Sequence, residues 1–328
     1  MNQESFALPA SRRQILRAAT FIAGGTAIAG LFPRTLLAAA QGAAAPADVV
    51  EQMKAQMSAI PLQTLKLRDN IHMLFGPGGN MVVLDGPDGK ILVDASFEKV
   101  APKIKEVLDG LGGAPLKMLI NTHWHFDHTD GNAALHKMGA TILAHENTRK
   151  RLSTRQTMTF LKMNFPPSPA DALPVQTFTE SCKLYVNGEE LSLTHVAPAH
   201  TDSDIHVHYR TSNVLHMGDT WFNGMYPFLD FSTGGRINGM IAAAAKGISL
   251  ADNSTKIVPG HGPVGDKAAL TKYHEVISKV RDVVKEQKAA GKSLTEVIAA
   301  KPTAEFDATY GNGFMKPDQF VELVYTTL

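Results

Sequence analysis

The stretch Asn121-Thr122-His123-Trp124-His125-Phe126-Asp127-His128 places three histidines and one carboxylate within six residues. It directly follows an apolar run at residues 117–120, which we predict to be a buried strand, so its polar side chains stand on a loop held by a rigid element. Imidazole nitrogens and carboxylate oxygens suit Zn²⁺. His123 and His125 project to one side of an extended chain. Asp127 and His128 are displaced by one position, so this stretch can supply ligands to two adjacent metal ions.

Three later segments offer ligands of the same types. They are Pro198-Ala199-His200-Thr201-Asp202, His216-Met217-Gly218-Asp219-Thr220 and Pro259-Gly260-His261-Gly262-Pro263, each next to a predicted strand. A single histidine or aspartate after a strand usually caps it or forms a turn. Taken together with the first stretch, however, His200, Asp219 and His261 complete two sets of metal ligands.

The remaining chain alternates between short apolar runs and turn signals. We predict strands at residues 71–75, 81–84, 91–94, 117–120, 141–144, 183–186, 191–194, 205–209, 214–217 and 256–258. We predict helices at residues 100–108, 132–138, 146–160, 237–250, 267–290 and 317–325. Residues 157–165 are apolar enough for a helix that either caps a pocket or faces the core. Strands and helices in this mixture indicate stacked sheets covered by helices, a layered α/β fold.

Composition limits the classes of protein to consider. The 328 residues carry 32 basic and 31 acidic side chains, so the charge balance gives no argument for a nucleic-acid partner. Cys182 is the one cysteine, which excludes an internal disulfide and a cysteine-rich zinc module. No repeat or linker divides the chain, and we expect one domain over residues 61–328. Residues 41–60 are expected to form a loosely held lead-in.

The N-terminal residues are typical of an export signal. Arg12 and Arg13 precede a moderately apolar run at residues 18–31, and Ala38-Ala39-Ala40 offers a cleavage site. The paired arginines resemble the twin-arginine signal. We therefore expect residues 1–40 to engage the twin-arginine export machinery, and the mature protein to be periplasmic or secreted in a bacterium, without stable membrane insertion. An uncleaved membrane anchor and an amphipathic N-terminal helix remain alternatives.

On its metal-ligand motifs the sequence resembles the metallo-β-lactamase superfamily from about residue 65 to residue 265. The resemblance implies a four-layer αββα sandwich with metals at one edge of the two sheets. It implies that one zinc is held by His123, His125 and His200, and the other by Asp127, His128 and His261. Asp219 matches the position that bridges the metals in glyoxalase-II-like hydrolases. Iron or manganese in place of either Zn²⁺ stays open.

Metal chemistry and the resemblance together predict a secreted, dinuclear zinc-dependent hydrolase. Two zinc ions about 3.5–4 Å apart bring the pKa of a bound water toward about 7, and the resulting hydroxide attacks the carbonyl of a small substrate. We favour a cyclic amide or ester as substrate. Asp127, which binds metal and orients the hydroxide, is the expected catalytic residue. In class B1 β-lactamases a cysteine takes the position of Asp219 and a lysine follows three residues later. Phe222 stands at that second position here, which disfavours efficient β-lactam hydrolysis.

Two other functions remain open. A glyoxalase-II-like thioester hydrolase is favoured by Asp219, although the chain offers no basic patch for glutathione. A non-catalytic metal-binding accessory protein of a periplasmic redox system is an alternative of another class.

Candidate substrate contacts follow from sequence position alone. Trp221, Asn223 and Tyr226 come soon after Asp219 and are expected to line the site, with Asn223 or Tyr226 donating to an oxyanion. Residues 76–80, which include three glycines, are expected to form a mobile hairpin over the metals or a plain tight turn. His206 and His208 share one strand face, expected to be solvated or to form a second layer around the metals.

Overall fold

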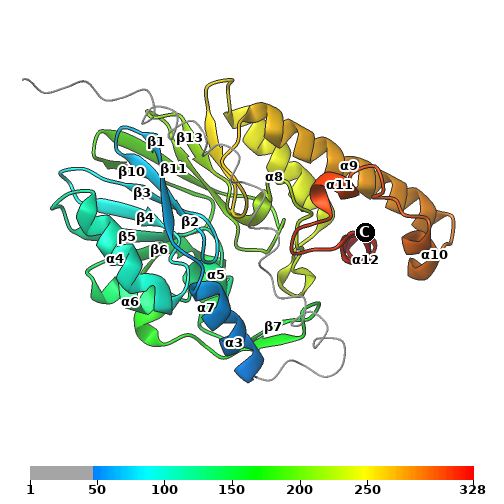
Figure 1. Cartoon of the computed structure of the whole chain (residues 1–328), viewed down its shortest axis with the longest axis horizontal. Coiled ribbons are helices and arrows are strands. Elements are labelled where there is room, and N and C mark those ends of the chain that lie inside the picture. The colour runs from blue at the N-terminus through cyan, green and yellow to red at the C-terminus, as the bar shows by residue number, and fades with distance from the viewer. Residues whose placement is uncertain (1–46) are drawn as a thin grey trace, which may run out of the picture.

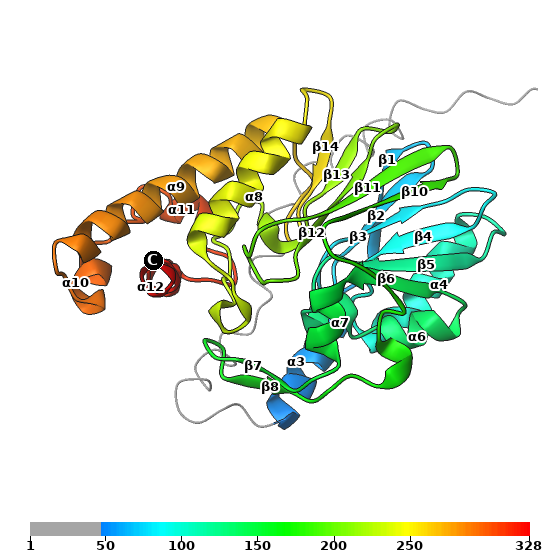
Figure 2. The same ribbon diagram turned by 180° about the vertical axis from the view of Figure 1, so that it is seen from behind.

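The structure is a computed structural model that describes residues 47–328, in which two β-sheets lie face to face with helices on both outer sides (Figures 1 and 2). This arrangement confirms the predicted layered α/β sandwich. The proposed export signal at residues 1–40 lies outside the described residues.

The first sheet has seven strands and carries the N-terminal half of the fold. Their order is β1 (Gln63–Arg68), β2 (Ile71–Phe75), β3 (Met81–Leu84), β4 (Lys90–Val93), β5 (Leu116–Asn121), β6 (Thr141–His145) and β9 (Gln176–Phe178). Strands β1 to β4 pair antiparallel, whereas β4, β5, β6 and β9 run parallel. Helices α4 (Ala101–Gly110) and α6 (Asn132–Lys137) lie along the outer face of this sheet (Figure 1).

The second sheet has five strands and leads into the C-terminal helices. Its order is β10 (Ser181–Val186), β11 (Glu189–His195), β12 (Ile205–Tyr209), β13 (Val214–His216) and β14 (Lys256–Val258). Helices α8 (Ile237–Leu250) and α9 (Lys267–Ala289) lie beside it, as Figure 2 shows. The chain ends with α10 (Leu294–Ala299), α11 (Asp307–Tyr310) and α12 (Pro317–Thr327), and α12 packs against α8, α9 and α10.

Both faces of the central strands are apolar because each face meets another layer. In β3, Val82 and Leu84 belong to the cluster between the two sheets, and Met81 and Val83 belong to the cluster beneath the helices. Successive side chains of a strand point to opposite faces, so a strand buried on both sides needs an unbroken apolar run. The four-residue run of β3 meets that requirement, since all its residues are buried.

The prediction of a helix through residues 146–160, and of an apolar helix at residues 157–165, is wrong beyond Leu152. Helix α7 spans Glu146–Leu152, and a hairpin of β7 (Gln156–Met158) and β8 (Met163–Phe165) follows. The hydroxyls of Ser153 and Thr154 donate to Lys150 O, an alternative to continuing the helix. In both hairpin strands the outer residues are buried and the middle residue is not, which is the two-residue period of a strand.

The interpretation of residues 41–60 as a loosely held lead-in is wrong for its second half. Helix α3 (Ala47–Ser58) buries Val50, Met53 and Met57 in the apolar core, at spacings that place them on one helix face. Lys54 Nζ also lies 2.6 Å from Asp130 Oδ1. Packing and this ion pair therefore fasten α3 to the sandwich.

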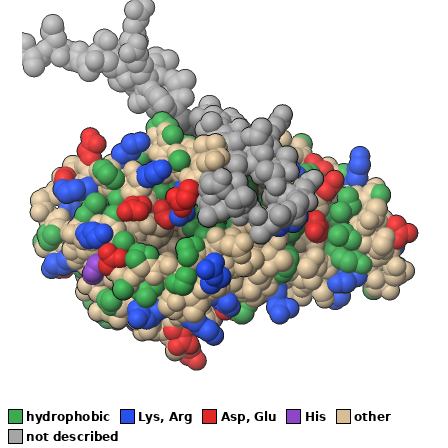
Figure 3. Space-filling model, turned by 90° about the horizontal axis from the view of Figure 1, so that it is seen from below, with side chains coloured by type: hydrophobic (Ala, Val, Ile, Leu, Met, Phe, Trp, Pro, Cys, Tyr) green, Lys and Arg blue, Asp and Glu red, His purple; other side chains and the backbone are tan. Residues whose placement is uncertain are grey.

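The surface of the molecule agrees with the even balance of basic and acidic residues in the sequence. On the face drawn in Figure 3, acidic and basic side chains are interspersed rather than gathered by sign.

Within residues 47–328 no helix has both the length and the apolar character needed to cross a membrane.

Candidate metal centre

The seven predicted ligands lie where strands of both sheets end. His123, His125, Asp127 and His128 follow β5, and the last two belong to the short helix α5 (Phe126–Thr129). The other three follow strands of the second sheet: His200 comes after β11, Asp219 after β13 and His261 after β14. Residues up to 138 positions apart in the sequence, 261 minus 123, thus meet at one edge of the sandwich.

These side chains form two groups, each with potential ligand atoms within 4.8 Å of one another. The first group is His123, His125, His200 and Asp219, and the second is Asp127, His128 and His261. In the first group His125 Nδ1 lies 2.8 Å from His200 Nε2. In the second, His261 Nε2 lies 3.2 Å from Asp127 Oδ2. The structure thus brings the seven predicted ligands together in two groups, with Asp219 in the first of them.

Asp219 faces both groups. Its Oδ2 lies 3.4 Å from His200 Nε2 in the first group. Its Oδ1 lies 3.1 Å from His128 Nε2 in the second group. The same Oδ2 is also 3.4 Å from His261 Nε2. One carboxylate therefore offers an oxygen to each side, as a bridging ligand must.

The donor atoms fit divalent metal ions. His123 Nε2, His128 Nε2 and Asp219 Oδ1 are buried and make no hydrogen bond, although two of them lie close together. A buried polar atom that makes no hydrogen bond lowers the stability of the fold by about 1–3 kcal/mol, so three such atoms in one place are strongly destabilising. A cation bound by each of the two groups would satisfy all three. Nitrogen and oxygen donors in this combination suit Zn²⁺, Fe²⁺ or Mn²⁺.

Two carboxylates fix the imidazoles from behind. Asp94 Oδ2 lies 2.7 Å from His128 Nδ1, and Asp230 Oδ2 lies 3.1 Å from His125 Nε2. Such a contact sets which ring nitrogen carries the proton and leaves the other nitrogen free for a metal. Neither carboxylate was predicted from the sequence. Asp94 ends a predicted strand, which is a usable signal, whereas nothing in the sequence around Asp230 distinguishes it.

The imidazole rings of His200 and His123 are also held in place, in both cases through the Nδ1 atom. His200 Nδ1 lies 2.8 Å from Phe228 O. His123 Nδ1 lies 3.0 Å from Thr122 Oγ1, whose hydroxyl donates to Asp94 Oδ2. These contacts turn His200 Nε2 and His123 Nε2 toward Asp219.

The ionisation of the cluster reflects its tight packing. Burial disfavours the charge on His261, but Asp219 and Asp127 outweigh it and raise the pKa of His261 to about 9. Burial likewise opposes ionisation of Asp219, but the facing imidazoles hold its pKa well below the usual range. Burial lowers the pKa of His123 well below its ordinary value. The cluster thus holds two anionic carboxylates among buried imidazoles, an arrangement that favours a bound cation.

The three residues predicted to contact the substrate lie in different surroundings. Tyr226 donates its hydroxyl to Asp307 Oδ1 at 2.9 Å and stacks on Phe320, so its prediction as an oxyanion donor is wrong. Trp221 is completely buried and cannot line an open site. Asn223 lies beside His261, since its backbone N–H donates to His261 O at 3.0 Å, but its side-chain Nδ2 donates to Pro263 O at 2.8 Å.

The second-layer histidines are buried, so the expectation of a solvated face is wrong. His206 is 1% exposed and its Nε2 lies 2.9 Å from Thr220 Oγ1, next to Asp219 in the chain. His208 is 6% exposed. Val207 and Tyr209 face the other sheet, which turns both histidines toward the helix layer. His206 therefore supports the loop of Asp219 from behind.

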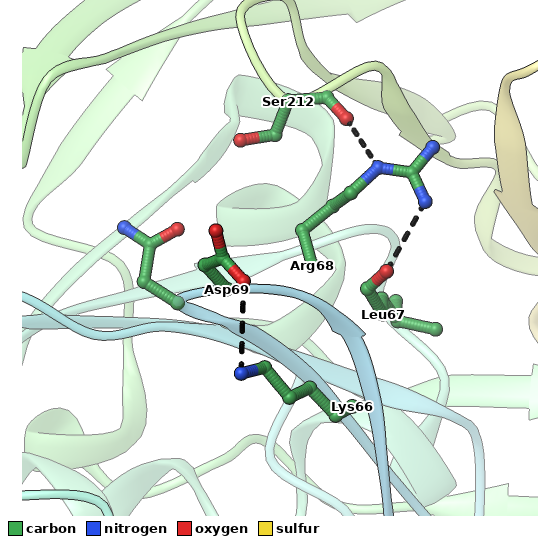
Figure 4. A pocket seen from close by; sticks show the side chains of 6 residues that line it. Lys66, Leu67, Arg68, Asp69 and Ser212 are labelled. Atoms are coloured by element: carbon green, nitrogen blue, oxygen red, sulfur yellow. Dashed lines mark hydrogen bonds and ion pairs between the residues drawn. The ribbon is translucent and has the colours of Figure 1, made fainter.

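A surface pocket lies at the far end of β2 from the ligands. Figure 4 shows it between the β1–β2 turn and Ser212, with Lys66 Nζ 3.7 Å from Asp69 Oδ1. Arg68 at its wall donates to Ser212 O at 2.8 Å and to Ser254 O at 2.8 Å. The arginine links the two sheets there, and none of the seven predicted ligands lines this pocket.

Comparisons with known proteins agree with this architecture. The family model of the metallo-beta-lactamase superfamily matches residues 75–272. The "Probable metallo-hydrolase MJ0888" of Methanocaldococcus jannaschii is 27% identical over 205 residues, which cover 60% of this chain and 94% of that protein.

Two solved structures share the fold. A metallo-beta-lactamase from Pontibacter korlensis has a TM-score of 0.54 and 17% identity, covering 66% of this chain and 99% of its own. The stereoselective inverting sec-alkylsulfatase Pisa1 from Pseudomonas sp. has a TM-score of 0.62 and 14% identity, covering 84% of this chain and 51% of its own. The matched family segment contains both groups of ligands and spans more than half of the sequence, and the chain therefore belongs to the metallo-β-lactamase superfamily of metallo-hydrolases.

Proposed function

We propose that this chain is a dinuclear zinc-dependent hydrolase that cleaves a small carbonyl substrate, most readily a cyclic amide or ester. The observation that supports this proposal is the position of Asp219, whose two oxygens face the two groups of ligands. When bound, two adjacent Zn²⁺ ions supply a Lewis acid for a carbonyl oxygen and lower the pKa of a water. His123, His125 and His200 would hold one ion, and Asp127, His128 and His261 the other, with Asp219 between them.

Asp127 is the residue we propose to act directly in catalysis. Its side chain is 14% exposed and that of His261 17%, whereas Asp219, at 3%, is covered. Substrate and water can therefore reach the centre from the side of Asp127. Burial disfavours the charge on Asp127, but His128 and His261 hold its pKa below the usual range. An ionised Asp127 accepts a hydrogen bond from a water molecule and orients its lone pair toward the substrate.

Phe222 favours a substrate that carries no anionic group where it would meet this side chain. Its ring stacks on the imidazole of His261, with centroids 5.3 Å apart and an interplanar angle of 17°. An aromatic ring cannot pair with a carboxylate as a lysine can. For this reason we propose that β-lactams carrying an anchoring carboxylate are poor substrates.

A panel of a lactone, a chromogenic cephalosporin, a thioester and a phosphodiester tests the proposed function. The zinc-loaded protein should hydrolyse the lactone fastest, and Asp127→Asn should lower kcat by about 100-fold or more. Asp69→Asn is the matched control, because Asp69 is fully exposed far from the ligands. Preference for the thioester would establish the glyoxalase-II-like alternative. Inertness toward every substrate with metal bound would replace the hydrolase proposal with the accessory-protein reading.

We also propose export through the twin-arginine machinery to the periplasm. The support is Arg12-Arg13 before the apolar run and the small residues that end near Ala40. Replacing both arginines with lysine in the full chain should leave the protein in the cytoplasm. Unchanged periplasmic recovery of that variant would contradict this route.

A further inference from the structure

The loop between β2 and β3, residues 76–80, lies at the metal edge of the sandwich. Gly79 N donates to Asp127 O at 3.1 Å, and Ser96 Oγ donates to Pro77 O at 2.7 Å. A Cβ on Gly78 would come within 2.6 Å of Asp127 O. The loop is therefore fastened against the segment that carries two ligands of the second group, rather than standing free of it as a mobile hairpin.

Asn80 extends this loop to the other sheet. Its side-chain Nδ2 donates to Pro259 O and to Gly262 O, both at 2.9 Å, and so holds the carbonyls on either side of His261. Its backbone N–H donates to Gly260 O at 2.8 Å. Asn80 is 5% exposed, so these bonds are sheltered from water.

The second group of ligands needs such a connection because it is divided between the sheets. Asp127 and His128 follow β5 in the first sheet, whereas His261 follows β14 in the second. The His261 loop is bonded to its own sheet, through Gly260 N to Gly218 O at 2.7 Å. A different cross-sheet bond, from Ile205 N to Thr122 O at 2.9 Å, lies beside the first group.

We propose that Asn80 is a positioning residue for the second metal. Its side-chain amide keeps His261, which follows a strand of the second sheet, close to Asp127 and His128, which follow a strand of the first sheet. This inference rests on the dinuclear proposal above. It predicts an effect confined to one of the two metals, because the side chain of Asn80 donates to Pro259 O and Gly262 O, both beside His261 of the second group. A general stabilising role would weaken both sites alike.

The test is zinc binding by the purified chain, measured by competition with a chromophoric chelator, without any substrate. Asn80→Ala should bind one Zn²⁺ as the unmodified chain does and the other about 10- to 100-fold more weakly, the usual cost of losing a group behind a ligand. Asn80→Asp keeps the shape but presents oxygens to two carbonyls, so it should lose at least as much affinity. Asn70→Ala is the matched control, since its amide donates only to Asp85 O at the other end of β2.

Ligand variants identify which metal is affected. In a His123→Ala background, which disables the first group, Asn80→Ala should weaken the remaining zinc. In an Asp127→Ala background, which disables the second, it should change nothing. Equal weakening of both metals, or no change in Asn80→Ala and Asn80→Asp, would overturn the positioning role. An unmodified chain that binds fewer than two Zn²⁺ would contradict the dinuclear proposal itself, and the positioning role with it.

Discussion

Gly79 lies directly against the ring of His128, so closely that a Cβ on Gly79 would be 2.1 Å from His128 Cε1. The ring cannot retreat, since its Nδ1 is held 2.7 Å from Asp94 Oδ2. Gly79→Ala should therefore displace His128 and lower affinity for the second zinc by about 10- to 100-fold, as for other disturbances behind a ligand. Zinc titration measures this.

Gly113→Ala is the control for this substitution, because nothing lies within 4 Å of a Cβ there. The control should bind zinc as the unmodified chain does. Full zinc affinity in Gly79→Ala would show that His128 is free to move or is not a ligand.

Asp230 should matter for the first metal in the way that Asp94 matters for the second. Its carboxylate accepts from Thr233 Oγ1 at 2.6 Å and faces His125 Nε2 at 3.1 Å. Asp230→Asn removes the charge that holds this imidazole and should weaken the first zinc about 10-fold or more. Asp282→Asn, at an exposed ion pair with Arg281, serves as the control in the same titration. Weakening of the second zinc instead would refute the assignment of His125 to the first group.

Removal of metal should destabilise the fold. A ligand that binds only the folded state adds RT ln(1 + [L]/Kd), about 4 kcal/mol when the free metal exceeds Kd 1,000-fold. Dialysis against a chelator should lower Tm by several degrees, and Zn²⁺ should restore it. Mg²⁺ should not, because it prefers oxygen ligands to the imidazoles that dominate here. An unchanged Tm after verified metal removal would show that the cluster holds no ion tightly.

His206 should make stability depend on pH. Burial, with smaller contributions from Lys246, His216 and His208, lowers the pKa of His206 from 6.5 to about 3. Between these values the unfolded chain binds a proton that the folded chain does not. The contribution of neutral His206 to the free energy of unfolding is thus complete above pH 6.5 and is lost as pH falls toward 3.

Urea unfolding of the unmodified chain and of His206→Gln between pH 8 and pH 4 measures this effect. The free energy of unfolding of the unmodified chain should fall faster with acidification, by up to about 1.4 kcal/mol per pH unit. The difference between the two proteins at pH 8 is the baseline, since His206 is neutral in both states there. Parallel pH profiles would mean that His206 takes up its proton without unfolding.

The sequence was most informative where chemistry and local pattern coincide. Residues 205–209 and 256–258 were predicted as strands and are β12 and β14 residue for residue, because β-branched and alternating residues between turn signals determine them. The histidines and aspartates that follow β5, β11, β13 and β14 indicate a candidate metal centre, because few residue types can bind a metal ion. Tertiary contacts carry no such local signal. Asp230 lies 105 positions from His125, and the apolar run at residues 157–165 does not reveal whether it is helix or hairpin.

Crystals of the zinc-soaked protein, measured for anomalous scattering at the zinc edge, test the dinuclear centre most directly. We predict two peaks on either side of Asp219, one against His123 Nε2, His125 Nδ1 and His200 Nε2 and the other against Asp127, His128 and His261. A single peak, or peaks away from these side chains, would contradict it.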